Sequence, residues 1–473
     1  MDDGLHCYVR VHGCNVHTRA CIADAGVALM SGQDAGPSRR RCFNCWRQGG
    51  PESEPLLPQV LSYQDMLGAS IDAISGAVRL VYCPRGGARL GARVREDVLL
   101  QIGGGGAARD SLCRAEAWVA EVSERCLLEK QARRRFLVLV NPASGSGRAQ
   151  QVWRVVEELW AAVPGIRCTV VHTTHQGDAF ERAKVLDLDS CDAIIVVSGD
   201  GLVHEVWNGL AARDDAEKAL QLPIGHLPGG SGNGLAKSVL DTCGESYGVL
   251  DMAFLIAKGG RQPIDLMSVQ AGQGGPRTSF LSLAAATISD VDLGSESLRC
   301  LGGFRFTLRA IWRVIRPLAL HAELVYWPVE VQGLPPAEAP QLSTQLSGEP
   351  WKRVEDDFAV FWGVNTAWAA SDSMPAPPAA LHDGLWHLLV LRGPQISRGT
   401  LLSLFLRLES GTHVDLPGVE LIRCRAFRLS PTARADGSRA GDGGGLLALD
   451  GERVPFGPVQ VWPARCTGQV LGR

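Results

Sequence analysis

Residues 133–262 alternate between short apolar runs and longer segments with apolar residues at helical spacing. Strands are predicted where apolar residues follow one another, in "RRRFLVLV", "IRCTVVHTT" and "CDAIIVV". Helices are predicted where apolar residues recur every three or four positions, in "QQVWRVVEELWAAV", "DAFERAKVL", "LVHEVWNGLAA" and "GVLDMAFLIAKG". Strand and helix take turns with short connections, so the pattern predicts a parallel α/β sheet.

After residue 262 the pattern changes to a series of β-like runs. They are "PIDLMSVQ", "TSFLSLAAATIS", "HAELVYWPVEV", "FAVFWGVNT", "LWHLLVLRG", "VELIRCRAFRLSP", "GGLLALDGE" and "VQVWP". Such a series is typical of an antiparallel sandwich, expected here over residues 263–465. A Pro-rich stretch at 332–350 is expected to be a surface insertion. The fold class is therefore α/β, with a Rossmann-like parallel lobe at 133–262 followed by a β-sandwich lobe.

The N-terminal third is predicted to form a β-rich extension. Residues 1–54 are rich in Gly, Arg, Ser and Pro and are expected to be poorly ordered. In residues 55–130, apolar runs such as "AVRLVYC" and "EDVLLQI" alternate with Gly-rich turns, and a helical pattern follows at 115–130. A small β unit closed by a helix resembles a pleckstrin-homology-like module in shape.

The chain has 473 residues, and its composition is that of a globular protein. Lys plus Arg number 47 and Asp plus Glu number 50, so the net charge of −3 gives no electrostatic reason to expect nucleic acid. We expect a cytoplasmic protein, because the sequence has neither a signal peptide nor a membrane-spanning apolar run. The 14 cysteines are scattered, which favours reduced thiols; Cys42 and Cys45 could form half of a zinc site, but no second pair follows.

Three polar, Gly-rich turns follow the predicted strands of the α/β lobe. They are "NPASGSG" (141–147), "SGDG" (198–201) and "PGGSGNG" (228–234). Because ligands bind at the carboxyl ends of parallel strands, we expect the three turns to converge on one site. Glycines let backbone N–H groups approach a phosphate, and the helices that follow favour negative charge. Taken alone, Asp200 could instead be an N-cap of the helix after it.

The turns match neither of the common nucleotide motifs. Gly145-Ser146-Gly147 lacks the third glycine of a dinucleotide fingerprint. In "GGSGNGLAKS" the glycine at 234 is followed by Leu235 and Ala236 instead of a lysine, so a Walker A motif is not met either. A phosphate ligand must therefore be held in another way.

The motifs "LVLVNPASGSG", "VVSGDGLVHEVWNGL" and "LPGGSGNGLA", in this order, resemble the catalytic domain of lipid kinases, and of sphingosine kinases in particular. The resemblance extends to "FLSLAAATISDVDLGSESLRCLGGFRFTL" and "LALDGE", and so covers about residues 133–465. Diacylglycerol and ceramide kinases usually carry Gly-Gly-Asp-Gly at the central turn, where this chain has Ser198.

The resemblance implies ATP- and Mg²⁺-dependent phosphorylation of the primary hydroxyl of sphingosine or a related sphingoid base. Asp200 is then the expected general base, which positions the hydroxyl and takes its proton. Glu452 is expected to hold Mg²⁺, and Arg299 and Arg305 to reach the phosphates. The nucleotide-binding residues so implied are Asn141, Pro142, Ala143, Gly145, Thr173, Ser231, Gly232, Asn233, Arg299, Arg305, Asp450, Gly451 and Glu452.

Substrate-binding residues implied by the same resemblance are Ser198, Gly199, Glu205 and Asp292. Asp292 is expected to decide the substrate, because a buried carboxylate needs a partner and a sphingoid base offers an ammonium group. The alternative is a surface acid in "SDVDLGSES". Glu205 could equally complement the N-terminal end of a helix. The family usually has Trp-Gly at Ala285-Ala286, so the shape of the pocket wall is left open.

A basic amphipathic helix is predicted at 303–318, "GFRFTLRAIWRVIRPL". Such a helix suits a peripheral membrane surface or a calmodulin-like partner, although it could also be a core stripe with solvated arginines. By the resemblance, Leu308, Ile311 and Trp312 are membrane-docking residues. A homodimer, a kinase for diacylglycerol or ceramide, and a non-catalytic lipid-binding or calmodulin-binding scaffold are alternatives that the sequence leaves open.

Overall fold

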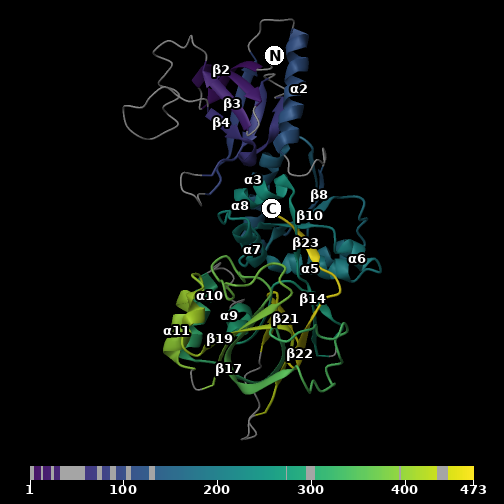
Figure 1. The fold of residues 1–473 in the computed structure, drawn as a ribbon, viewed down its shortest axis with the longest axis vertical. Coiled ribbons are helices and arrows are strands. Elements are labelled where there is room, and N and C mark those ends of the chain that lie inside the picture. The colour runs from purple at the N-terminus through teal and green to yellow at the C-terminus, as the bar shows by residue number, and fades with distance from the viewer. Residues whose placement is uncertain are drawn as a thin grey trace.

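The computed structural model describes residues 5–11, 14–22, 26–31, 59–71, 77–85, 92–102, 108–126, 134–272, 274–294, 304–393, 396–433 and 446–472. Figure 1 shows three parts along the longest axis of the molecule. An N-terminal sheet with helix α2 lies at one end, an α/β lobe in the middle and a β-rich lobe at the other end. The predicted α/β fold class, with one parallel and one antiparallel lobe, is confirmed.

The α/β lobe is built on a six-stranded sheet in the order β12-β23-β11-β10-β8-β9. Five strands are parallel, and β12 runs antiparallel at one edge. The strands are β8 (Arg134–Val140), β9 (Ile166–His172), β10 (Ala193–Ser198), β11 (Ile224–Pro228), β12 (Arg261–Ile264) and β23 (Gly468–Leu471). The central strand β10 is buried along its whole length, as its unbroken apolar run requires.

Helices of this lobe begin where the polar turns end. They are α3 (Arg148–Ala161), α4 (Asp178–Lys184), α5 (Asp200–Ala211), α6 (Ala216–Ala219), α7 (Gly234–Thr242) and α8 (Val249–Lys258). The apolar run "LPIGHLPGGSGNGLAKSVL" (222–240) splits into β11 and α7 at the glycines of 229–234. Its second half is therefore a helix that the pattern did not separate from the strand.

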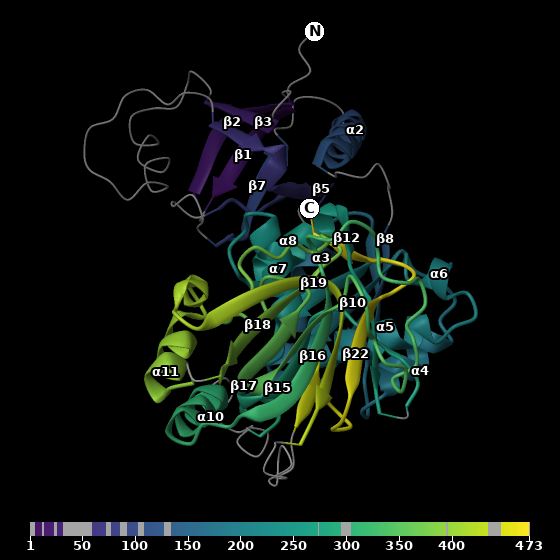
Figure 2. The same cartoon turned by 60° about the horizontal axis from the view of Figure 1, so that its bottom comes forward.

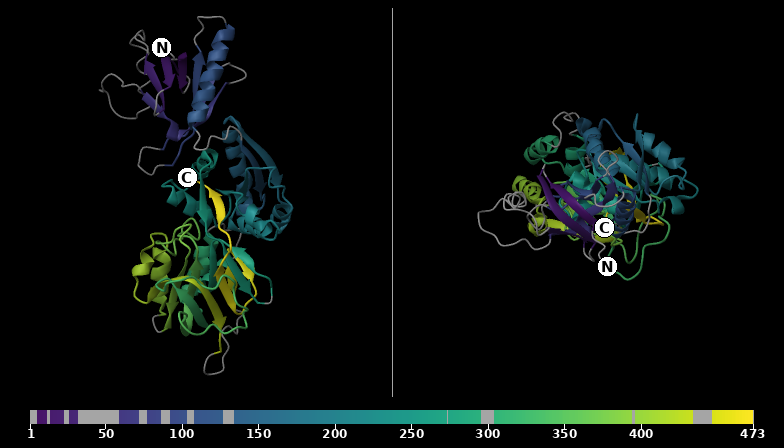
Figure 3. Two further views of the ribbon diagram at one scale, coloured as in Figure 1. Left: turned by 45° about the vertical axis from the view of Figure 1, so that its right-hand side comes forward. Right: turned by 90° about the horizontal axis from the view of Figure 1, so that it is seen from above.

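The C-terminal strand β23 crosses the boundary expected between the two lobes. It follows the β-rich lobe in sequence but pairs with β11 and β12 of the six-stranded sheet. Figure 3 shows this yellow strand running back from the β-rich lobe into the α/β lobe. The boundary at residue 262 likewise falls inside β12.

The second lobe is a ten-stranded antiparallel sheet folded on itself. Its strands are β13 (Met267–Ala271), β14 (Arg277–Ser279), β15 (Ser282–Ala286), β16 (Leu320–Pro328), β17 (Lys352–Val364), β18 (Trp386–Arg392), β19 (Val419–Pro431), β20 (Leu447–Leu449), β21 (Glu452–Val454) and β22 (Val459–Pro463). The 13-residue strands β17 and β19 each pair with both β16 and β18, so these four strands close into a ring. Apolar side chains such as Phe361 and Trp386 fill the space within this fold.

Three helices cover one outer side of the second lobe: α9 (Thr287–Leu293), α10 (Phe304–Ile315) and α11 (Arg398–Arg407). Figure 2 shows α10 and α11 side by side beyond the sheet. The helix expected at 303–318 is therefore present over its described part, whereas α9 continues a run that the sequence treated as β. The Pro-rich segment 332–350 is tied down, because Trp462, Gln460 and Arg428 donate hydrogen bonds to its backbone carbonyls.

The N-terminal part contains a seven-stranded antiparallel sheet in the order β4-β3-β2-β1-β7-β6-β5. Its elements are β1 (Leu5–Val11), β2 (Cys14–Ile22), β3 (Gly26–Ser31), β4 (Gln59–Ser62), β5 (Met66–Ile71), β6 (Val78–Tyr82), β7 (Glu96–Ile102) and α2 (Ala108–Cys126). β1 pairs with β7 and β3 with β4, so one sheet crosses the boundary expected at residue 54. Strands β1, β2 and β3 were not predicted because the overall composition of residues 1–54 is polar. Cys42 and Cys45 lie outside the described residues.

Buried polar contacts join this N-terminal sheet to the α/β lobe. Lys258, at the end of α8, donates from Nζ to the carbonyls of Tyr63 and Cys126 at 2.6 and 2.5 Å. Arg93 donates to both carboxylate oxygens of Glu245, at 2.7 and 3.1 Å. Burial lowers the pKa of Lys258 to about 8. The two parts therefore meet through specific hydrogen bonds as well as through apolar packing.

Candidate functional site

The three Gly-rich turns lie against one another at the carboxyl ends of β8, β10 and β11. A Cβ atom at Gly145 would lie 2.4 Å from the carbonyl oxygen of Gly229. A Cβ at Gly199 would lie 2.8 Å from the carbonyl oxygen of Gly232. No side chain fits at such distances, so these positions need glycine for close backbone approach. The prediction that the three turns converge is therefore confirmed.

Asp200 lies at the centre of these turns and is buried. Its Oδ2 accepts a hydrogen bond from the backbone N–H of Gly234 at 2.8 Å, and its Oδ1 accepts one from Leu235 at 3.1 Å. The N-cap of α5 is Gly199, so the carboxylate of Asp200 caps the neighbouring helix α7 and not its own helix. Each oxygen keeps a second lone pair with which it can accept another hydrogen bond.

Burial raises the pKa of the Asp200 carboxyl above its usual range. The two backbone hydrogen bonds act in the opposite direction, as would a positive charge on His226, but burial lowers the pKa of that histidine. A buried carboxylate with a raised pKa is a stronger base than one in water, and such groups gather at functional sites.

Most of the residues expected at a nucleotide line these turns. Asn141 accepts a hydrogen bond from the N–H of Ala143 at 3.0 Å, which shapes the first turn. Asn233 closes the third turn by two 3.0 Å hydrogen bonds with Gly230. Thr173 follows β9 and bonds to the carbonyl of Val140 at the same edge. Pro142, Ala143 and Ser231 are exposed beside them, and Gly232 is half-buried.

Glu452 reaches this site from the second lobe. Its Oε1 would lie 3.1 Å from a Cβ at Gly201, in the first turn of α5. Its Oε2 accepts a hydrogen bond from the side-chain amide of Gln176 at 3.2 Å. A carboxylate beside the first turn of α5 suits a divalent cation that also binds phosphate oxygens. Within the described residues, no three acidic, His or Cys side chains are grouped as a metal site.

Asp450 has a different environment from its neighbour Glu452. Its Oδ1 accepts hydrogen bonds from the Ser279 hydroxyl and from the N–H groups of Leu281 and Ser282, at 2.7 to 3.0 Å. Its Oδ2 lies 2.8 Å from Nδ1 of His204, on α5 of the other lobe. The buried carboxylate therefore joins the lobes, and any contact with a nucleotide would come from the backbone of Asp450 and Gly451.

The expected substrate-binding residues are not all in one place. Ser198 and Gly199 lie in the central turn, next to Asp200. Asp292 is half-buried on α9, and a Cβ at Gly451 would lie 4.0 Å from its Oδ2, which places it close to the β20–β21 turn. Glu205 instead accepts a hydrogen bond from the N–H of Ala179 at 3.2 Å. Glu205 therefore complements the N-terminal end of α4, in line with the alternative that it stabilises a helix terminus and does not bind substrate.

Asp290, two residues before Asp292, is fully engaged by α10. Both of its oxygens accept hydrogen bonds from Arg309 and Arg313, at 2.6 to 2.9 Å. Desolvation opposes ionisation of Asp290, but these arginines more than offset it and hold its pKa below the usual range. Arg299 lies outside the described residues, and Arg305 is placed only by its backbone in the first turn of α10.

The outer face of α10 is apolar and exposed. Leu308, Ile311 and Trp312 are 37%, 50% and 39% exposed. Arg309 and Arg313 lie over the ring of Trp312, 4.7 and 4.3 Å from its centroid. The predicted docking residues therefore share one accessible face and are not part of a core.

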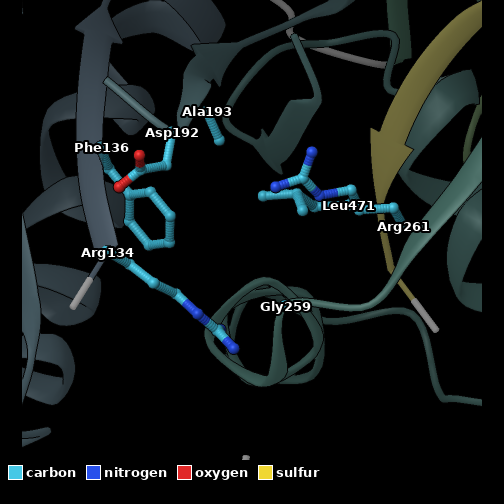
Figure 4. A pocket seen from close by; sticks show the side chains of 7 residues that line it. All are labelled: Arg134, Phe136, Asp192, Ala193, Gly259, Arg261 and Leu471. Carbon is cyan, nitrogen blue, oxygen red and sulfur yellow. The ribbon is translucent and has the colours of Figure 1, made fainter. Parts of the chain in front are cut away.

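A separate pocket lies at the opposite end of the parallel sheet (Figure 4). It is lined by Arg134 and Ala193, at the amino ends of β8 and β10, and by Gly259 and Leu471. Arg134 donates hydrogen bonds to the carbonyls of Ala257 and Lys258 and so closes the end of α8. The pocket is therefore on the far side of the sheet from the Gly-rich turns.

Two residues at the site were not among those expected from the sequence. Gln176 contacts Glu452 across 276 positions of chain, and His226 lies beside Asp200 from the neighbouring strand β11. His226 is the one polar side chain in the short run "LPIGHLP". That polar position was the one signal in the sequence that could have indicated it.

Comparisons with known proteins agree with this geometry. The diacylglycerol kinase catalytic domain model matches residues 135–269, and the YegS C-terminal NAD kinase beta sandwich-like domain model matches 337–469. Sphingosine kinase 1 of Homo sapiens is 34% identical over 346 residues, which cover 69% of this chain and 88% of that protein. The chain belongs to the sphingosine kinase family. It is therefore an enzyme of the lipid kinase class, which implies the use of ATP.

Further relatives of this kinase support the assignment. Sphingosine kinase 2 of Arabidopsis thaliana is 32% identical over 346 residues, covering 68% of this chain and 70% of that protein. Sphingoid long chain base kinase 4 of Schizosaccharomyces pombe is 31% identical over 356 residues, covering 72% and 75%. A solved structure, a putative diacylglycerol kinase from Bacillus anthracis str. Sterne, shares the fold with a TM-score of 0.53 and 17% identity, covering 73% of this chain and 97% of that one. In the described part of this kinase, no helix combines the length and apolarity needed to cross a bilayer.

Proposed function

We propose that this kinase transfers the γ-phosphate of ATP to the primary hydroxyl of sphingosine or a related sphingoid base. The observation that carries the proposal is the buried carboxylate of Asp200, fixed by the N–H groups of Gly234 and Leu235 among three Gly-rich turns. The named activity of the human and plant relatives supports the choice of lipid.

In the proposed reaction, Asp200 orients the lipid hydroxyl and accepts its proton. The hydroxyl oxygen forms a bond to the γ-phosphorus while the bond to the bridging oxygen of ADP breaks. The proton leaves late in such a loose transition state, so positioning contributes more than base strength. The product is the 1-phosphate of the sphingoid base.

The Gly-rich turns suit a triphosphate. Gly145 and Gly147 have φ values of 57° and 89°, and a Cβ at Gly147 would meet nothing within 4 Å. The backbone at this turn is therefore open to a ligand. We assign the nucleotide to Asn141, Gly145, Thr173 and the turn at 231–233, with Arg299 and Arg305 on its phosphates. A bound Mg²⁺ ion, held by Glu452, would offset the negative charge of the phosphates.

In this proposal, the lipid tail lies against an apolar cluster of the second lobe. Ile288 on α9 packs with Leu401 and Leu404 on α11 and with strands β17 and β18. This region adjoins Asp292, so a lipid with its tail here would bring an amine towards that carboxylate. A protonated amine pairs with a carboxylate, whereas neutral diacylglycerol offers no such partner.

Replacing Asp292 with Asn is expected to raise KM for sphingosine by about 10- to 100-fold, because a charge-assisted hydrogen bond contributes about 1.5–3 kcal/mol. Initial rates with sphingosine in detergent micelles measure the change. Asp189→Asn removes a charge from an exposed side chain, 86% accessible, and serves as the matched control. An unchanged KM in Asp292→Asn would exclude the pairing.

We also assign the exposed face of α10 to a membrane surface, from which the lipid substrate is taken. Leu308→Gln with Trp312→Gln is expected to lower the fraction bound to anionic liposomes in co-sedimentation, because it removes apolar area from the bilayer interface. Val185→Gln, at an isolated position 81% exposed on the α/β lobe, is the control. Liposome binding equal to wild type in the double variant would contradict this assignment.

A further inference from the structure

His226 lies beside the catalytic turn and is almost completely buried. It belongs to β11, next to β10, which ends at the turn of Asp200. Its Nε2 is 3.0 Å from the carbonyl oxygen of Ser198. Among the residues that the structure describes, its Nδ1 has no hydrogen-bond partner, and it lies 3.7 Å from Oδ1 of Asp200. An unpartnered buried nitrogen aimed at the catalytic carboxylate calls for a functional explanation.

The contact with Ser198 fixes the tautomer of the ring. A carbonyl oxygen only accepts hydrogen bonds, so Nε2 must carry a hydrogen in the neutral and in the charged ring. In the neutral ring, Nδ1 therefore presents a lone pair towards Asp200. An ionised carboxylate has no hydrogen to offer this lone pair, whereas a protonated one has.

We propose that His226 is a positioning residue for phosphoryl transfer, whose Nδ1 accepts a hydrogen bond from Asp200 once that residue has taken the proton of the substrate. The proposal rests on the proposed function, because it takes Asp200 as the base. The lipid O–H bond breaks, an O–H bond forms on Asp200, and this hydrogen is held by the Nδ1 lone pair. The Nε2 hydrogen stays on the carbonyl of Ser198, so no other reactant is needed.

The 3.7 Å separation is roughly 1 Å longer than a hydrogen bond, which fits a contact that forms only when Asp200 is protonated. Burial lowers the pKa of His226, so its ring is neutral and its lone pair is available near neutral pH. Stabilising the protonated carboxyl makes Asp200 a stronger base.

Few other charged groups surround the pair. In the described residues, Asp200 is the one charged group that acts on His226, and Asp450 faces Asp200 from the second lobe. Lys237, on α7, lies over the ring of Trp368, 4.3 Å from its centroid. Tyr247, just before α8, also interacts with Asp200, and burial raises the pKa of its phenol, so it is neutral near neutral pH. A pH effect seen on changing His226 is therefore assigned to Asp200.

The test compares pH profiles of kcat/KM for sphingosine in wild type, His226→Phe and His226→Gln. We expect the acid limb to move about one pH unit lower in His226→Phe, because a neutral hydrogen bond is worth about one unit of pKa. Gln keeps one donor and one acceptor, so His226→Gln should restore most of the wild-type limb. Leu227→Val, a buried change at the next position of β11, should leave the limb in place.

Three results for the acid limb of the kcat/KM profile would overturn the proposal. The limb could be unmoved in both His226 variants, it could move to higher pH, or it could be the same in His226→Phe and His226→Gln. If Asp200→Asn loses activity while the acid limb of the kcat/KM profile is unmoved in His226→Phe, the role of His226 is rejected. The proposed function then still stands. Nitrogen-15 NMR of the histidines tests the tautomer that the proposal requires, independently of any phosphate transfer. Wild type must show His226 with hydrogen on Nε2 alone at neutral pH, and a hydrogen on Nδ1 there would contradict the proposal.

Discussion

Replacing Asp200 with Asn is expected to lower phosphoryl transfer by about 10²- to 10⁴-fold, the usual contribution of a general base. The amide cannot take the proton of the lipid hydroxyl, although its size is nearly that of the carboxylate. The rate of transfer from radiolabelled ATP to sphingosine measures the effect. Binding of ATP should be retained, because the Gly-rich turns that are assigned to the phosphates keep their backbone.

The same change carries a modest stability cost. Asp200 satisfies two backbone N–H groups with its two oxygens, and an amide has one oxygen to offer. One donor at the start of α7 is therefore left without its partner, at about 1–3 kcal/mol. The control for the loss of a buried charge is Asp178→Asn. The buried carboxylate of Asp178 accepts hydrogen bonds from the N–H of Thr174 and from Arg182. Transfer near the wild-type rate in a folded Asp200→Asn variant would remove Asp200 from the mechanism.

Replacing Asp450 with Ala is expected to have the largest effect on stability. Its carboxylate satisfies four donors of the segment 279–282 and contacts His204 on the other lobe. Removing a buried charged partner of this kind costs about 3–5 kcal/mol. Urea unfolding followed by tryptophan fluorescence measures the change, and Trp207, beside Phe280, reports on this contact.

Glu452→Ala is the matched control for this prediction. Glu452 lies two residues after Asp450 in the sequence and is half-buried. Among the described residues, its side chain accepts a hydrogen bond from Gln176. We expect unfolding close to that of wild type in Glu452→Ala, with activity lost because the variant lacks the carboxylate proposed to hold Mg²⁺. Equal unfolding curves for wild type and Asp450→Ala would show that the carboxylate does not hold the lobes together.

The parts of the fold set by local periodicity could be predicted from the sequence. β8, β10 and the helices after them lie where the apolar runs and the glycines indicated. The three turns converge because parallel strands end at one edge of a sheet, a property of the topology alone. Helix α9 was missed because it begins at Thr287, directly after the apolar residues of β15, and a short apolar run does not distinguish helix from strand.

What could not be predicted depends on contacts between distant segments. Asp450 and Glu452 stand two residues apart in one motif, yet one joins the lobes and the other faces the Gly-rich turns. Nothing in "LALDGE" distinguishes these environments. Glu205 follows the turn of Asp200 in sequence, but the packing of α4 on α5 takes its carboxylate to the N–H of Ala179. Residue type therefore indicated the chemistry of the site, while tertiary packing decided which side chains are free to perform it.

The most direct test of the central claim is phosphate transfer from ATP by the purified protein, with sphingosine, diacylglycerol and ceramide offered separately in detergent micelles. The account predicts transfer to sphingosine and none to the two neutral lipids. Transfer to a neutral lipid would keep Asp200 as the base and exclude Asp292 as the selecting residue. No transfer to any of the three lipids would contradict the proposed activity and favour a lipid-binding scaffold.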